Sequence, residues 1–284
     1  MLSEKSNAMT NLLWQRLERL LQEKVAAFPG VTGVALKELG EGLTIDLNAG
    51  EIFPTASTIK IHVLTKLLQR AEAGELDLDE RIVVDPATHV QGSGVIAYLE
   101  GPVELSLRDM ATLMMIASDN TATNICIDRA GIAETNALIQ GMGLQKTVLR
   151  RKMMDTIATM HEQENVATPG ELIAMIEFLQ AGKPSPAVAE QALAIMKKHN
   201  YGFIDRGIPV TVAVANKPGW IEAVMCDAAL VYLPRRPYLL AVMTKYALCS
   251  AAEQEHFIID IAATVHETMQ MLDSSSRYGR AVHS

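Results

Sequence analysis

The chain has 284 residues, of which 49% are hydrophobic and 20% charged, a composition typical of a globular protein with a large core. The formal net charge of −8 and the lack of a long basic run argue against a nucleic-acid-binding protein. Three cysteines, scattered histidines and no CxxC or HExxH motif indicate neither a disulfide framework nor a metal site, and we expect no cofactor.

The first part of the chain predicts a helix followed by two strands. Apolar residues recur at helical spacing from Leu13 to Phe28, which predicts an amphipathic helix that ends at Pro29-Gly30. Residues 31–39 and 43–47 are predicted to be strands, which pair as a hairpin around the glycines between them.

The stretch Phe53-Pro54-Thr55-Ala56-Ser57-Thr58-Ile59-Lys60 comes next and carries the first candidate chemistry. An apolar periodic run follows it, so a helix is predicted to start here and to end near Gly74. Ser57 and Lys60, three positions apart, would share one helix face at an N-terminus that carries positive partial charge. A hydroxyl beside an amine that takes its proton is a candidate nucleophile, although an SxxK taken alone is better explained by a capped helix with a solvated lysine.

The rest of the chain predicts helices first and strands afterwards. Residues 75–200 are expected to be mainly helical, with helices at 105–117, 120–130, 186–197 and from Thr168-Pro169 to Leu179. Strands are predicted at 210–215, 223–233 and 238–246, before a closing helix over 251–272.

Strands at both ends and helices between them predict an α+β fold. One antiparallel sheet would be built from both termini and flanked by helices (α/β/α), with an all-helical domain inserted. We expect residues 10–56 plus 208–272 to form the sheet domain, 57–207 the helical domain, and 273–284 a polar, frayed tail. No apolar run reaches the length of a membrane span, and the N-terminus lacks a secretory h-region, which indicates a cytoplasmic location. No feature indicates an oligomeric state.

Two further motifs follow Ser57 and Lys60. Ser118-Asp119-Asn120 separates two predicted helices, and Lys217-Pro218-Gly219 lies on a predicted strand. Singly, these motifs fit an N-cap and a strand end. Together and in this order, they resemble the SxxK, SDN and KTG signatures of the class A β-lactamases and penicillin-binding proteins. Further matching segments extend the resemblance over residues 12 to 270, among them Gly92-Ser93-Gly94, Asn165-Val166-Ala167-Thr168-Pro169 and Asp227.

The resemblance implies a β-lactamase/transpeptidase-like fold and a serine hydrolase that works through an acyl-enzyme. It implies that Ser57 is the nucleophile, Lys60 a candidate base, and Ser118 the relay of a proton to the leaving nitrogen. Positive charge and substrate contacts are implied for Lys217, Asn120, Gly219 and Trp220, with the N–H groups of Ser57 and Trp220 as the oxyanion hole. The substrate would be a small-molecule β-lactam, peptide or ester, and the family's usual location implies a periplasmic or secreted protein.

Two departures from the family's pattern affect this expectation. Pro218 stands where the family has a hydroxyl residue that helps to hold the substrate carboxylate, and it removes a hydroxyl and a backbone donor. After Leu149-Arg150-Arg151 the family's deacylation glutamate is missing. Asp155 is the nearest carboxylate in register, and it fits a catalytic role or an ion pair with an arginine equally well; Glu162 and Glu164 lie closer to the end of the loop.

We therefore expect opening of a β-lactam amide with slow deacylation. One alternative is a penicillin-binding-like D-alanyl peptidase, or an esterase, acting on a non-lactam substrate. A second alternative is a non-catalytic binding or sensor protein on this fold, which the joint presence of Ser57, Lys60, Ser118 and Lys217 disfavours.

Overall fold

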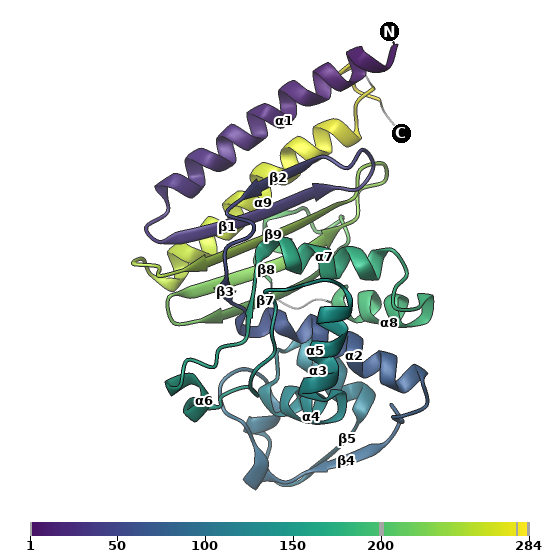
Figure 1. Ribbon diagram of the computed structural model, residues 1–284, viewed down its shortest axis with the longest axis vertical. Coiled ribbons are helices and arrows are strands. Elements are labelled where there is room, and N and C mark those ends of the chain that lie inside the picture. The colour runs from purple at the N-terminus through teal and green to yellow at the C-terminus, as the bar shows by residue number, and fades with distance from the viewer. Residues whose placement is uncertain (1, 199–201, 277, 283–284) are drawn as a thin grey trace.

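The computed structural model describes residues 2–198, 202–276 and 278–282 (Figure 1). Within them, an antiparallel sheet has the strand order β2-β1-β9-β8-β7. The strands are β1 (Val31–Glu38), β2 (Thr44–Leu47), β7 (Val214–Ile221), β8 (Val224–Val231) and β9 (Tyr238–Lys245). Strands β1 and β9 pair along their whole length, so the two ends of the chain meet in the middle of the sheet. The predicted α+β fold, with a sheet built from both ends, is confirmed.

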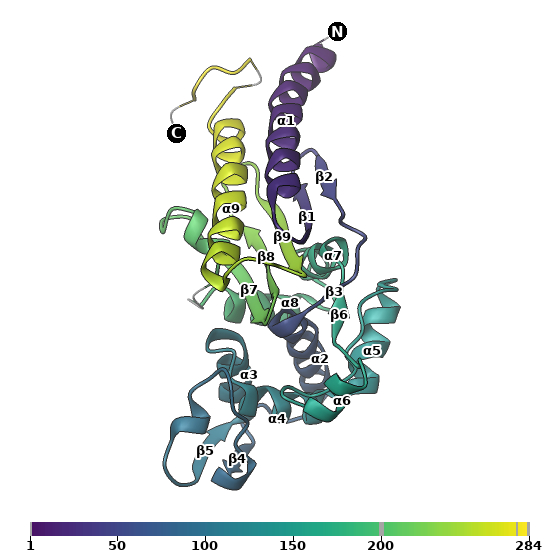
Figure 2. The ribbon, with the colours of Figure 1, turned by 90° about the vertical axis from the view of Figure 1, so that its left-hand side faces the viewer.

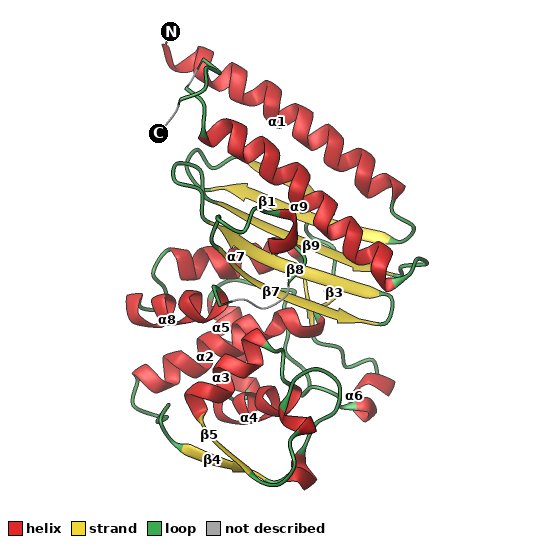
Figure 3. Ribbon diagram, turned by 180° about the vertical axis from the view of Figure 1, so that it is seen from behind, coloured by secondary structure: helices red, strands yellow, loops and turns green. Residues whose placement is uncertain are grey.

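Helices cover both faces of this sheet (Figures 2 and 3). One face carries α1 (Leu2–Ala27) and α9 (Ala251–Asp273), and the other carries α7 (Pro169–Gln180) and α8 (Pro186–Met196). Strand β8 is buried on both sides, because its alternate residues point into two separate apolar clusters. Cys226 and Leu230 face α7 and α8, whereas Met225 and Val231 face α1 and α9.

The helical part is assembled around α2 (Lys60–Glu72), whose first residues are buried on every side. Around it pack α3 (Leu107–Ile116), α4 (Asn120–Ala130), α5 (Ile132–Gly141) and α8. Ser106 and Asp109 form a capping box that starts α3, which explains the position of this helix. The remaining elements are α6 (Thr156–Met160), the paired strands β3 (Phe53–Pro54) and β6 (Val166–Ala167), and the paired strands β4 (Arg81–Val84) and β5 (Val103–Ser106). Short 3₁₀ turns lie at Ala56–Ile59, Pro86–Thr88, Ile96–Tyr98 and Asp205–Gly207.

Several predicted boundaries differ from the structure. The strand predicted at 210–215 starts only at Val214 and continues to Ile221, because the preceding residues form a turn in which Val212 N donates to Pro209 O. Pro218 is tolerated in this strand because β7 is the edge of the sheet.

Two further expectations were wrong. The paired strands β4 and β5 lie within the stretch predicted as mainly helical. The described part of the tail is not frayed: Val282 N donates to Ser274 O at 2.7 Å, and the Arg235 side chain donates to the carbonyls of Asp273 and Ser275. The division into a sheet domain and a helical domain stays a prediction.

Candidate active site

A cleft of about 740 Å³ lies where β7 meets the helical part of the molecule. Its walls come from the turn before α2, the loop at Gly92–Gly94, the loop that contains α6, and the turn between β7 and β8. Ser57, Asn120, Met153, Glu164 and Trp220 are among the residues that line it. The first two motifs thus reach the cleft through Ser57 and Asn120, and Trp220, the residue after the third motif, lines it as well.

Ser57 lies in the 3₁₀ turn Ala56–Ile59, immediately before α2, and not in the first turn of an α-helix as predicted. Thr55, the residue before this turn, anchors it to the loop at Asn165: the N–H and the hydroxyl of Thr55 both donate to Asn165 O, at 2.9 and 3.1 Å. The buried hydroxyl of Thr58 donates back to Thr55 O at 2.8 Å. These bonds fix the backbone on both sides of Ser57 and leave its side chain in the cleft.

Ser118 is the meeting point of the predicted catalytic side chains. Its Oγ lies 2.8 Å from Ser57 Oγ, and the two hydroxyls share a hydrogen bond. Lys60 Nζ lies 3.0 Å from the same Oγ and 2.8 Å from Ser118 O. Lys217 Nζ donates to Ser118 Oγ at 3.2 Å and to Pro218 O at 3.0 Å. The structure thus brings Ser57, Lys60, Ser118 and Lys217 together.

Burial lowers the pKa of both amines. Lys60 is fully buried, and this desolvation, together with the charge of Lys217, lowers the pKa of Lys60 well below its usual value. Burial also lowers the pKa of Lys217, to about 8, with Asp227 and Cys226 opposing the shift. Both shifts favour the neutral form of the amine more than in an exposed lysine.

Asn120 enters the cleft from the N-terminus of α4. Its Nδ2 donates to Gln91 O at 3.0 Å, and its Oδ1 accepts from Lys60 Nζ at 3.4 Å. The neighbouring Asp119 is the N-cap of α4 and also accepts the N–H groups of Val95 and Ile96. Gly94 has φ +117°, and a Cβ there would overlap the Asp119 carboxylate, so only glycine fits.

Strand β7 supplies the opposite wall. A Cβ at Gly219 would lie 2.5 Å from Ser57 N, so this strand can approach the nucleophile only because residue 219 is glycine. Trp220 lines the cleft and packs edge-on against Phe203, with ring centroids 6.2 Å apart. Asp227 on β8 accepts the N–H groups of Phe203 and Ile204, which ties this packing to the sheet.

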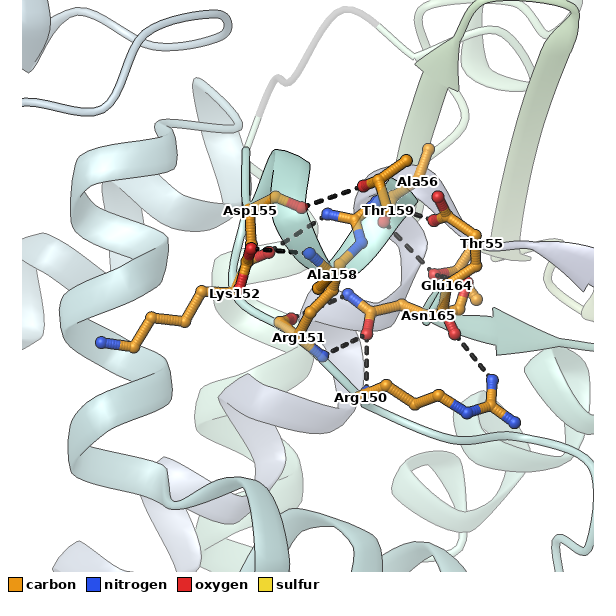
Figure 4. A network of polar contacts seen from close by, with 10 residues as sticks. All are labelled: Thr55, Ala56, Arg150, Arg151, Lys152, Asp155, Ala158, Thr159, Glu164 and Asn165. Atoms are coloured by element: carbon orange, nitrogen blue, oxygen red, sulfur yellow. Dashed lines mark hydrogen bonds and ion pairs between the residues drawn. The ribbon is translucent and has the colours of Figure 1, made fainter. Parts of the chain in front are cut away.

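Asp155 does not join the other predicted residues. Its carboxylate accepts the N–H of Ala158 at 3.0 Å and caps α6, and its carbonyl accepts the Thr159 hydroxyl (Figure 4). Asp155 lines a different hollow, together with Lys152. Its carboxylate therefore serves an N-cap, which neither of the two sequence-based interpretations anticipated.

Several residues that line the cleft had no predicted role, and Glu164 and Met153 are two of them. Glu164 accepts from Arg151 Nη2 at 2.7 Å, and both side chains line the cleft. Asn165 holds the loop beneath them, because its Oδ1 accepts the N–H groups of Arg150 and Arg151 and its Nδ2 donates to Arg151 O (Figure 4). In the sequence, the only feature that pointed to Glu164 was its position near the end of the loop.

Met153 is the second such residue. Its side chain is buried and lines the cleft, and its backbone is fixed by Asn124, which accepts from Met153 N at 2.7 Å and donates to Met153 O at 3.1 Å. It lies two residues after Leu149-Arg150-Arg151, the run after which the family's glutamate is missing. An apolar side chain thus lines this part of the cleft.

Among the described residues, no group of histidine, cysteine, aspartate or glutamate side chains is arranged to hold a metal ion. No helix in that part of the chain combines the length and the apolar character needed to cross a bilayer.

Known proteins resemble this chain over most of its length. The model of a family described as "Beta-lactamase enzyme family" matches residues 13–269. The β-lactamase CARB-4 of Pseudomonas aeruginosa is 30% identical over 261 residues, 89% of this chain and 90% of the relative. The crystal structure of a β-lactamase from Sphaerobacter thermophilus shares 30% identity at a TM-score of 0.81, over 88% of this chain and 95% of that one. A mutant of PBP-A, in an acyl-enzyme complex with penicillin G, shares 27% at a TM-score of 0.80, over 92% and 97%.

Proposed function

Because the chain belongs to the β-lactamase enzyme family and is a β-lactamase-like serine hydrolase, we propose that Ser57 opens the amide of a β-lactam and becomes acylated. The observation that carries this proposal is the contact of Ser57 Oγ with Ser118 Oγ at 2.8 Å, while both buried amines reach the same Ser118 oxygen. A nucleophilic serine needs a route by which its proton leaves, and this contact supplies one.

The contacts of Lys60 favour a relay through Ser118. A neutral amine has two N–H groups and one lone pair. Ser118 O and Asn120 Oδ1 only accept hydrogen bonds, so they take the two N–H groups, and the lone pair then points to the Ser118 hydroxyl. Since hydroxyl hydrogens rotate, Ser57 can donate to Ser118 while Ser118 donates to Lys60.

In the acylation step, Ser57 Oγ bonds to the carbonyl carbon of the lactam. At the same time the proton of Ser57 passes to the Ser118 oxygen, and the proton of Ser118 passes to Lys60. The C–N bond of the lactam breaks, and the nitrogen takes the proton back through Ser118. Lys217 remains charged and stabilises the negative charge that develops nearby.

The oxyanion hole is proposed to consist of the N–H groups of Ser57 and Trp220. The close approach of β7 at Gly219 supports it, because it brings that strand's backbone against the backbone of the nucleophile. One such donor contributes about 2.7–4 kcal/mol to lowering the barrier.

Hydrolysis of the acyl-enzyme is proposed to be slow. Asp155 caps α6 outside the cleft, Glu164 is paired with Arg151, and Met153 presents no carboxylate. A positioned general base accelerates such a step by about 10²–10⁴-fold. A long-lived adduct on Ser57 is the expected consequence.

Mass spectrometry of the intact protein after mixing with penicillin G or a chromogenic cephalosporin tests the proposal. We expect a mass increase of one drug molecule on Ser57, which Ser57→Ala abolishes. The absence of both an adduct and hydrolysis, in a folded protein that still binds the drug, would contradict the proposal.

A peptidase or esterase acting on a non-lactam substrate is the second candidate, and Pro218 is the observation that favours it. Lys217 donates to Pro218 O and Ser118 Oγ, and residue 218 offers neither a hydroxyl nor an N–H to a substrate carboxylate. Faster acylation by a D-alanyl peptide or a p-nitrophenyl ester than by a cephalosporin would favour this candidate.

A further inference from the structure

We propose that the acyl donors of this enzyme carry an uncharged, apolar acyl group, which the wall of the cleft around Met154 and Ile221 receives. This inference rests on the proposed function of Ser57 and goes on to the substrate class. It starts from the distribution of exposed apolar side chains, because large apolar residues that gather at the surface usually mark a binding site.

Two segments that line the cleft, the loop that contains α6 and the turn between β7 and β8, expose such residues. Met154, Trp220 and Ile221 line it directly, although 53%, 50% and 44% of their surfaces are exposed. Helix α6 adds Met160, which is 83% exposed and lies one helical turn beyond the cleft residue Thr156. Apolar side chains therefore stand on two parts of the wall, the α6 loop and the β7–β8 turn.

The charges of the cleft disfavour an anionic acyl group. Among its described lining residues, the cation is Arg151, which Glu164 neutralises at 2.7 Å. Glu222 is exposed at the β7–β8 turn and adds a negative charge. Lys217 is buried, and its amine contacts Ser118 and Pro218. A carboxylate on the acyl side chain would be desolvated here without an unpaired cation to receive it.

The size of the cleft fits this class of substrate. A volume of about 740 Å³ is that of a site for a drug-sized molecule, and such sites are mostly apolar with a few placed polar groups. Here Ser57 is half-buried and Asn120 is buried, whereas the apolar residues Met154, Trp220 and Ile221 are exposed. The reacting carbonyl and the acyl group thus meet different parts of the wall.

A series of p-nitrophenyl esters tests the inference through the acylation rate constant of Ser57, measured from the burst of p-nitrophenol. We expect hexanoate to acylate at least about tenfold faster than acetate, since each buried methylene adds to binding. We expect the hemisuccinate, whose acyl group ends in a carboxylate, to react more slowly than pentanoate of similar length. Met154→Ala together with Ile221→Ala should reduce the ratio of hexanoate to acetate, and Leu248→Ala, an exposed apolar residue outside the cleft, should leave it unchanged.

The two proposals fail in different ways. Equal rates for acetate and hexanoate, or a hemisuccinate faster than pentanoate, would overturn the substrate class while Ser57 remained the nucleophile. An unchanged ratio in the double variant would overturn the assignment to this wall. If neither the esters nor a fluorophosphonate label Ser57, the proposed function itself fails.

Discussion

Ser118 Oγ lies 2.8 Å from Ser57 Oγ, and it is the one oxygen that both buried lysines also reach. Ser118 has φ +50°, a left-handed conformation that is uncommon outside glycine and costs free energy. The conformation is held because the neighbouring Asp119 caps α4 and binds the loop at Val95 and Ile96. The fold therefore maintains a strained residue at the point of the proposed proton relay.

The first prediction concerns this relay. Ser118→Ala should lower the acylation rate of Ser57 by about 10²–10⁴-fold, the usual contribution of a positioned proton-transfer group. Stopped-flow acylation with a chromogenic cephalosporin measures it. Ser93→Ala is the matched control, because Ser93 lines the same cleft and contributes its carbonyl to Asn120 N. A Ser118→Ala variant that acylates at the wild-type rate would exclude the relay.

The second prediction is a bell-shaped pH dependence of acylation. The rate should rise with pH as Lys60 loses its proton, and fall above about pH 8, where Lys217 loses its positive charge. Lys217→Arg should move the alkaline limb to higher pH, because a guanidinium keeps its charge. Acylation rates of the wild type and of Lys217→Arg, measured between pH 5 and 10, test this prediction. If the alkaline limb stays near pH 8 in both, it reports the titration of a group other than Lys217.

The third prediction is a gain of turnover from a single substitution. In Met153→Glu, the Asn124 bonds would present a carboxylate from a fixed backbone into the cleft. Deacylation should accelerate by about 10²–10⁴-fold, while acylation changes little. The decay of the Ser57 adduct, followed by mass spectrometry, measures this effect. Met153→Gln has the same shape without the base, so an equal acceleration in Met153→Gln would show that base catalysis is not the cause.

Much of this site could be predicted from local patterns. The order of the three motifs identified Ser57, Lys60, Ser118 and Lys217, and the structure brings them into contact. Capping residues and apolar periodicity placed α4 and α7 correctly, because those signals are local. Strand β7 was misplaced because the turn before it and its position at the sheet edge depend on contacts far along the chain.

The side-chain contacts within the α6 loop could not be predicted from local sequence patterns. The pairing of Glu164 with Arg151 and the capping of α6 by Asp155 depend on side-chain directions within an irregular segment. By its spacing along the sequence, Asp155 was the nearest carboxylate in register, but in the structure its side chain caps helix α6. Burial sets the lowered pKa of Lys60, and burial follows from the packing of the whole helical part.

The last prediction separates the N-cap role of Asp155 from a role as the base for deacylation. Asn is as good an N-cap as Asp, so Asp155→Asn should keep α6 and leave the decay of the Ser57 adduct unchanged. Asp155→Ala removes the cap at a cost of about 0.5–2 kcal/mol, which should appear in the free energy of unfolding or in local hydrogen exchange at α6. The adduct should still decay at the wild-type rate in the alanine variant if its loop stays ordered. Decay that is tenfold slower in Asp155→Asn, with unfolding unchanged, would instead identify this carboxylate as the base for deacylation.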